Sequence, residues 1–272
     1  MSKLNVIARA TLERSIFILA AISFMSAAWP QAYAQTSVKV GYAPFAVPLA
    51  WLPNATPENY RSLDGNTAQG AMVDIYKAVA KEIGLTLQFV CLVSGELPEA
   101  QRSEKIDIRI VDASSAGKEG LAATAPIYND SEILIANASD GREYKTWDDL
   151  RGQVIGSRIG SVYDDDLKKA GLQVKSYAAA PDLYGVVNSG EIKVAINTTY
   201  VATAYALQQG RYPNIRIVKT YQVRYPRLSA IGARNEQKTL IADIDVVLAK
   251  LKTNGTANSI FTNYGIGGAL VK

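Results

Sequence analysis

Residues 70–92, GAMVDIYKAVAKEIGLTLQFVCL, contain a change of hydrophobic period that decides the fold class. In the first part, apolar residues recur at intervals of three and four, which is typical of one face of an amphipathic helix. Gly84 predicts the end of this helix, because glycine readily takes the left-handed conformation that follows many helices. Leu85 to Leu92 are mostly apolar and predict a buried strand. A helix followed directly by a buried strand is the repeating unit of an α/β domain.

The same alternation continues on both sides of this stretch. Val38 to Tyr42 alternate with period two and predict a first strand. A long loop, 43–69, rich in Pro, Asn and Gly, follows it, and loops of this length are uncommon unless they have a function. The further predicted strands cover 106–111, 132–137, 153–157, 172–177, 192–197, 215–219 and 228–233, and the further predicted helices cover 95–103, 162–170, 180–189, 198–209, 240–251 and 255–263.

Strands that alternate with helices in this way predict an α/β fold with mostly parallel sheets covered by helices on both faces. The block 141–222 contains a complete set of such units by itself. We therefore expect two α/β lobes, with the second inserted into the first.

The first 34 residues have the organisation of an export signal. Lys3, Arg9 and Arg14 form a positive leader, residues 15–29 are apolar or small, and Ala32-Tyr33-Ala34 ends the segment in a small-x-small pattern. The apolar core is about 14 residues long, whereas a spanning helix needs about 20. We expect cleavage after Ala34, a periplasmic location and a mature chain that does not span the membrane.

The composition excludes several classes of protein. The chain has 29 basic and 25 acidic residues, a net charge of +4, which is too balanced to indicate a nucleic acid or an anionic membrane as partner. It contains no His and a single Cys, so histidine-based catalytic triads, histidine or thiolate zinc sites and an intramolecular disulfide are excluded. We expect no metal and no cofactor, and we interpret Cys91 as a buried small side chain at a strand end.

Several short segments resemble motifs that recur in one family of proteins. They are Val38-Lys39-Val40-Gly41, the stretch from Gly70 to Leu85, Lys105-Ile106-Asp107-Ile108, Pro126-Ile127-Tyr128, the stretch from Trp147 to Gly152, Gly160-Ser161, the stretch from Asn188 to Ala195, and Asn254-Gly255-Thr256 to Tyr264-Gly265. In their order along the chain they resemble the periplasmic substrate-binding proteins of amino-acid-type ABC transporters, the family 3 solute-binding proteins.

This resemblance implies a two-lobed type II periplasmic-binding-protein fold, in which two crossover strands join the lobes and the ligand lies in the cleft between them. The crossovers would fall at about 131–140 and 219–230. The first lobe would comprise 35–135 and 225–272, and the second lobe 136–224. The protein would capture a small organic solute and deliver it to an ABC permease by hinge closure, and we expect it to be a monomer.

Ligands of open α/β sheets bind at the carboxyl ends of strands, and the loop after the first predicted strand is one such place. Tyr42, Phe45 and Trp51 lie there. The resemblance implies an aromatic contact with the ligand from this loop. The alternative is that the three rings pack beneath the long loop.

The segment 112–118, Asp-Ala-Ser-Ser-Ala-Gly-Lys, is the second such place. The resembled family carries an Arg there that binds the ligand carboxylate, and this segment has none. Lys118 is the nearest cation, and it offers a point charge rather than a two-pronged contact. Ser114 and Ser115 offer hydroxyls.

Two further places lie in the second lobe. Gly160 and Ser161 open a predicted helix, where backbone N–H groups suit an anion, although Ser161 also suits a helix cap. Asn197 ends a predicted strand at the place where the resembled family holds an Asp for the ligand's ammonium group, and Tyr200 lies beside it. Because the expected Arg and Asp are both replaced, we expect a solute other than a typical zwitterionic α-amino acid.

Two other functions remain open from the sequence. One is an accessory role in a periplasmic redox system, with the loop 46–69 as a contact surface. The other is a dehydratase acting on cyclohexadienyl acids, for which Asp112 is the candidate acid; fold alone does not decide function. We expect that the protein is not an enzyme.

Overall fold

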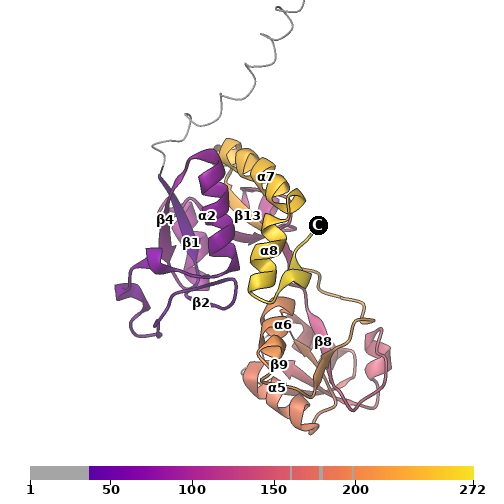
Figure 1. The fold of residues 1–272 in the computed structure, drawn as a ribbon. Helices are drawn as coiled ribbons and strands as arrows, with labels where there is room; N and C mark the ends of the chain where they lie inside the picture. The colour runs from indigo at the N-terminus through magenta and orange to yellow at the C-terminus, as the bar shows by residue number, and fades with distance from the viewer. Residues whose placement is uncertain (1–36, 160, 178–179, 198) are drawn as a thin grey trace, which may run out of the picture.

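A computed structural model describes residues 37–159, 161–177, 180–197 and 199–272, which form two α/β lobes (Figure 1). The predicted export signal and Gly160 lie outside the described residues. The predicted two-lobed α/β fold is confirmed. No described helix is both long and apolar enough to cross a membrane.

The first lobe is built on a sheet with the strand order β4-β1-β5-β13-β6, in which β7 also pairs with β13. The neighbours β4, β1 and β5 are parallel, whereas β13 is antiparallel to β5, β6 and β7. These strands are β1 (Ser37–Tyr42), β4 (Thr86–Cys91), β5 (Ile108–Asp112), β6 (Leu121–Ala123), β7 (Tyr128–Asn129) and β13 (Leu228–Arg234).

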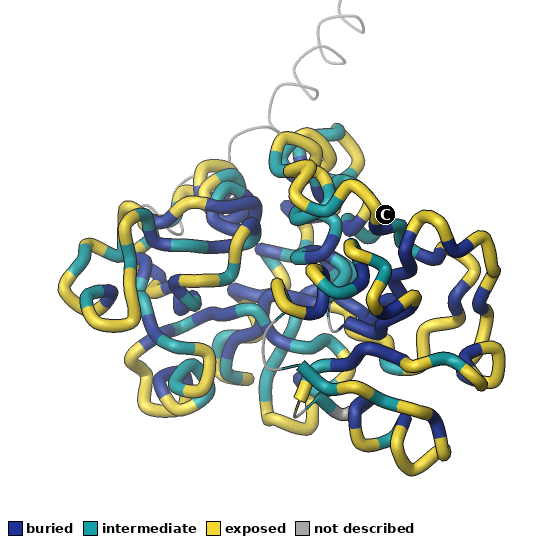
Figure 2. The backbone as a smooth tube through the Cα atoms, turned by 90° about the horizontal axis from the view of Figure 1, so that it is seen from below, coloured by how far each residue is buried: buried dark blue, intermediate teal, exposed yellow. Residues whose placement is uncertain are grey.

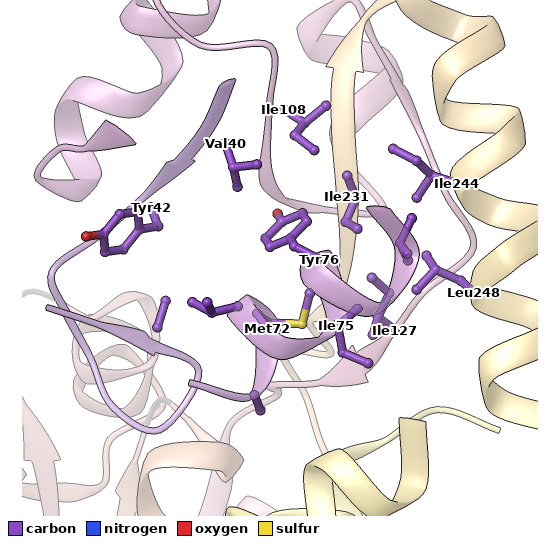
Figure 3. Packing of buried hydrophobic residues seen from close by; sticks show 14 of the residues in the cluster. Val40, Tyr42, Met72, Ile75, Tyr76, Ile108, Ile127, Ile231, Ile244 and Leu248 are labelled. Carbon is purple, nitrogen blue, oxygen red and sulfur yellow. The ribbon is translucent and has the colours of Figure 1, made fainter. Parts of the chain in front are cut away.

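The helices of the first lobe are α2 (Ala71–Ile83), α3 (Leu97–Arg102), α7 (Lys238–Thr253) and α8 (Thr256–Asn263). As predicted, α2 ends at Gly84, whose φ of 76° places it in the left-handed region. The apolar face of α2 packs on the sheet and on α7, and Figure 3 shows this core around Val40, Ile75, Tyr76, Ile231 and Leu248.

The second lobe has a five-stranded sheet with the order β10-β9-β11-β8-β12. The pairs of β9 with β10 and with β11 are parallel, and β8 is antiparallel to both of its neighbours. The strands are β8 (Ile133–Asn137), β9 (Val154–Arg158), β10 (Gln173–Tyr177), β11 (Val194–Asn197) and β12 (Ile215–Ile217), and the helices are α4 (Val162–Lys169), α5 (Ala180–Ser189) and α6 (Tyr200–Gln208).

Both sheets are therefore mixed, although the sequence pattern predicts mostly parallel ones. The antiparallel members are β8 and β13, which follow the two passages of the chain between the lobes. Such a strand enters its sheet from the other lobe, so it runs against the strands of the βα units. Hydrophobic periodicity contains no information on strand direction.

The chain passes between the sheets after β7 and again before β13. All of β8 pairs in the second sheet, including residues 133–135, which the sequence assigns to the first lobe. Helix α6 belongs to the second lobe, yet Val201 is part of the core cluster of the first lobe together with Phe261 of α8. The lobes are thus in apolar contact beside the crossovers. Figure 2 shows the buried residues gathered in the interior of the molecule and the exposed residues along its outer loops.

The long loop 43–69 contains more structure than the sequence predicts. A short hairpin joins β2 (Phe45–Ala46) to β3 (Ala50–Trp51), and Trp51 exchanges backbone hydrogen bonds with Gln69 at 2.8 and 2.9 Å. Two short 3-10 turns also lie in this loop, η1 (Tyr60–Ser62) and η2 (Gly65–Thr67). Further 3-10 turns outside the loop are η3 (Ser94–Glu96), η4 (Ala116–Glu119), η5 (Trp147–Leu150), η6 (Asn235–Gln237) and η7 (Gly267–Ala269).

Candidate ligand-binding cleft

Two cavities meet at the junction of the lobes. The smaller, of about 280 Å³, lies in the first lobe between the end of β1, the β2–β3 hairpin and α2. The larger, of about 380 Å³, takes its wall from the end of β5, the start of α4 and both crossovers. Asp130 and Arg227 line both cavities. We define the two cavities together as the cleft.

Tyr42 lines the smaller cavity, as expected of a residue at the carboxyl end of β1. Its ring packs edge-on against Phe89 at 6.2 Å, and its hydroxyl donates to the Gly65 carbonyl at 3.1 Å. Tyr76 of α2 lines the same cavity, and its buried hydroxyl has no hydrogen-bond partner among the described residues. The smaller cavity therefore has aromatic walls and a free phenol group.

The other two predicted aromatics pack on the loop and on the C-terminal segment. The Phe45 ring lies edge-on to Tyr60 at 6.1 Å and is 50% exposed. The Trp51 ring lies edge-on to Tyr264 at 5.9 Å. Neither residue lines the two cavities of the cleft. Their ligand contact stays a prediction.

Asp112 lines the larger cavity, whereas the residues that follow it turn away into local contacts. The Ser114 N–H and hydroxyl donate to Asp112 Oδ1 at 2.8 and 2.7 Å. The Ser115 hydroxyl donates to Glu119 at 2.8 Å. Lys118 is exposed on η4 and lines neither cavity.

A buried arginine lies close to this segment and was not predicted. Arg109 of β5 lines the smaller cavity and is 8% exposed. Its guanidinium pairs with Glu119 at 2.8 Å and donates to Gln101 at 2.9 Å. The Ser115 hydroxyl and Arg109 together lower the pKa of Glu119. The charge of Arg109 is therefore already paired within the first lobe.

Ser161 caps α4, which is one of the two roles weighed for it. Its hydroxyl accepts from the Asp164 N–H at 3.3 Å and donates to the Arg158 carbonyl at 2.7 Å. Tyr163, two residues further, lines the larger cavity. The first turn of α4 thus contributes to the wall of the cleft through Tyr163.

Asn197 ends β11 and is 1% exposed. Its side-chain nitrogen lies 2.6 Å from the Tyr184 hydroxyl and 2.9 Å from that of Thr203. Tyr200 lies in the first turn of α6, and its N–H donates to the Ser131 carbonyl at 3.1 Å. Both residues are engaged within the second lobe or against the crossover, and neither lines the two cavities.

Asp130 is a cleft residue that sequence reasoning missed. It lies just before β8, is 7% exposed and accepts from the Val201 N–H in the first turn of α6 at 3.3 Å. Burial raises the pKa of Asp130 from 3.8 to about 6, although the charge of Arg227 and the bond from Val201 oppose the rise. Asp130 is thus a buried acid on the wall that the two cavities share, and its burial disfavours the ionised form.

Glu132 is the second missed acid. It is 2% exposed, lines the larger cavity and lies on the first crossover. Its Oε1 accepts from the Tyr221 hydroxyl at 2.9 Å and from the Arg224 N–H at 2.7 Å, both on the second crossover. The Trp147 indole in turn donates to the Tyr221 hydroxyl at 2.9 Å. These bonds join the two crossovers directly.

One signal in the sequence points to these residues. The predicted crossovers, 131–140 and 219–230, include Glu132 and Arg227, and Asp130 directly precedes the first. Polar residues at a junction of domains commonly line ligand sites. A search restricted to the strand ends therefore misses the crossover residues that line the cleft.

Comparison with known proteins agrees with this architecture. The family model of bacterial extracellular solute-binding proteins, family 3, matches residues 48–267. The ABC transporter arginine-binding protein 1 of Escherichia coli is 24% identical, with 76% of this chain and 86% of that protein covered. The L-cystine-binding protein TcyA of Bacillus subtilis is 19% identical, with 75% of each chain covered.

Solved structures share the fold. The L-cystine solute receptor of Neisseria gonorrhoeae, in its unliganded open conformation, superposes with a TM-score of 0.71 at 16% identity, over 87% of this chain and 96% of that one. The two-lobed fold and the match over residues 48–267 lead to one conclusion. The chain belongs to the bacterial extracellular solute-binding proteins, family 3.

Proposed function

We propose that the protein captures a small organic solute in the cleft and delivers it to an ABC permease when the lobes close about the crossovers. The observation that carries this proposal is the larger cavity, whose wall combines Asp112 of the first lobe, Tyr163 of the second and residues of both crossovers. A solute bound there touches every part that moves in a hinge closure, so it stabilises the closed form.

The relatives support this function. By their names they bind arginine, cystine and histidine, and the arginine-binding protein is named as part of an ABC transporter. The family is one of binding proteins, in agreement with the expectation that the chain is not an enzyme. No contact in the described residues favours a redox-accessory or a dehydratase role.

We also propose ligand contacts that differ from the pattern implied by the resemblance. Lys118 is exposed on η4, and the Asn197 amide is occupied inside the second lobe. We propose that the polar contacts come mainly from Asp112, Asp130, Glu132 and Arg227. We further propose that the leader is cleaved after Ala34, that the protein acts in the periplasm as a monomer, and that the second lobe extends to residue 224.

Native mass spectrometry of the purified protein tests the binding step, since a solute carried through purification appears as a mass above that of the chain. Small-angle scattering before and after removal of that solute tests closure. We expect a smaller radius of gyration with the solute bound. A protein that carries no solute, and whose scattering is the same with every small molecule offered, would contradict the proposed function.

A further inference from the structure

A cavity of about 360 Å³ lies in the second lobe outside the cleft, and we call it the outer cavity. Its wall combines η5 and the residues beside it, the turn between α4 and β10, and residues 222–224 of the second crossover. It shares Arg224 with the larger cavity of the cleft, and the rest of its wall lines neither cavity of the cleft. The outer cavity is therefore a neighbour of the cleft rather than a part of it.

The outer cavity has apolar side chains in its wall. Trp147 and Leu172 are largely buried, with 8% and 9% of their surface exposed, and Val223 beside them is 42% exposed. The Trp147 indole N–H donates to the Tyr221 hydroxyl at 2.9 Å, which fixes the ring in place. A hydrocarbon or aromatic group that covers Val223 and the accessible part of the ring therefore removes apolar surface from water.

Two guanidinium groups line the same cavity, and its only described acid does not balance them. Arg224 lies over the Trp147 ring, 4.1 Å from its centroid, and forms no ion pair with any residue that the structure describes. Arg151 pairs with Asp148 at 3.1 Å, but the two side chains are 59% and 82% exposed, so this pair is weak. Two arginines against one aspartate give the wall an excess of positive charge.

We propose that the outer cavity is a second binding site, for a small organic acid whose carboxylate meets Arg151 and Arg224 and whose apolar part covers Val223. A guanidinium group presents its N–H donors in a planar fork that matches a carboxylate. The contact with the Trp147 ring limits the positions that the Arg224 guanidinium takes. An inorganic anion would use the charge and leave the apolar surface in water, so the wall favours an organic acid.

An acid bound there would touch two parts of the second half of the molecule. It would join the segment around η5 to residues 222–224, and so hold the second crossover against the second lobe. A ligand that binds only the folded protein raises its melting temperature by mass action. None of the polar residues proposed to hold the solute in the cleft lines the outer cavity, so this inference is independent of the proposed function.

Titration calorimetry and melting temperatures, both measured at constant ionic strength, test the inference with small probes. The acids are hexanoate and benzoate. Hexanamide and benzamide are their neutral counterparts, which keep the apolar part and lack the charge. Inorganic sulfate is the opposite control, because it has the charge and lacks the apolar part.

Two pairs of variants locate the site. Arg151→Gln is the first test variant, because Arg151 lines the outer cavity and neither cavity of the cleft. Its matched control is Arg211→Gln, at an exposed arginine of the same lobe that lines none of the three. Val223→Glu is the second test variant and adds an acid to the wall. Its matched control is Val246→Glu, at a valine of α7 that is 56% exposed.

We expect hexanoate or benzoate to bind the native protein and to raise its melting temperature. Arg151→Gln and Val223→Glu should each weaken this binding about threefold to tenfold, since charge pairs between exposed groups are of that strength. The two control variants should bind as the native protein does. Circular dichroism shows whether each variant folds, and if one test variant does not fold, the other decides.

Four results would overturn the inference. They are no binding by either acid, binding of an amide as tight as that of its acid, binding of sulfate as tight as that of both acids, and native affinity in a folded test variant. The last result would place the bound acid elsewhere on the protein. The proposed function survives each of them, because it depends on a solute in the cleft and on lobe closure.

Discussion

Replacing the buried Asp130 by Asn should stabilise the protein at neutral pH and leave its stability unchanged in acid. Asn keeps the oxygen that accepts from the Val201 N–H at 3.3 Å, and it removes the charge. Burial raises the pKa of Asp130 from 3.8 to about 6 in the folded protein. Each pKa unit corresponds to about 1.36 kcal/mol, and the pKa rises by about two units. The ionised side chain therefore lowers the folding stability by about 3 kcal/mol.

The sign follows from linkage between protonation and folding. Between pH 3.8 and about 6 the folded protein binds more protons at Asp130 than the unfolded chain, so its stability falls as pH rises. The stabilising contribution of protonation is complete below pH 3.8 and lost above about pH 6. Asp130→Asn should therefore match the native protein near pH 4 and exceed its free energy of unfolding by up to about 3 kcal/mol at pH 7.5.

Urea denaturation measured at several pH values provides the assay, with Trp51 and Trp147 as fluorescent reporters in the first and second lobes. Asp140→Asn is the matched control of opposite sign, because bonds from Arg142 and Tyr144 hold the pKa of Asp140 well below its usual range. This control should lose stability at pH 7.5 and less in acid. An Asp130→Asn variant that is no more stable than the native protein at pH 7.5 would refute the reasoning.

Three further predictions concern single residues. Gly84→Ala should lower the free energy of unfolding by about 1 kcal/mol in urea denaturation, because its φ of 76° disfavours a side chain, and an unchanged midpoint would contradict this. Tyr221→Phe should cost about 1–3 kcal/mol, since it removes the donor to Glu132 and the acceptor for Trp147; full native stability would show that the link between the crossovers contributes nothing. Burial raises the pKa of the half-buried Cys91 thiol, so its reaction with a thiol reagent at pH 8 should be slower in the folded protein than after unfolding, and equal rates would argue against its burial.

Local patterns in the sequence contain most of the secondary structure of this protein. The helix that ends at Gly84 and the strand that follows it were both predictable, because a 3.6-residue period and a short apolar run depend only on neighbouring residues. The two-lobed arrangement was predictable from the block 141–222 and from the family motifs. Tyr42 was predictable as a cleft residue because it ends the first strand.

Tertiary structure decided the rest. Glu132 meets Tyr221 across 89 positions of sequence, and Asp130 meets Val201 across 71. No local period records which distant side chains become neighbours, or that β8 and β13 enter their sheets in the antiparallel direction. The sequence by itself therefore determined the long helices and strands, the number of lobes and the absence of histidine chemistry, but not the short strands β2, β3, β6 and β7. Only folding brought two buried acids to the wall between the lobes, because that wall exists where the two crossovers lie side by side.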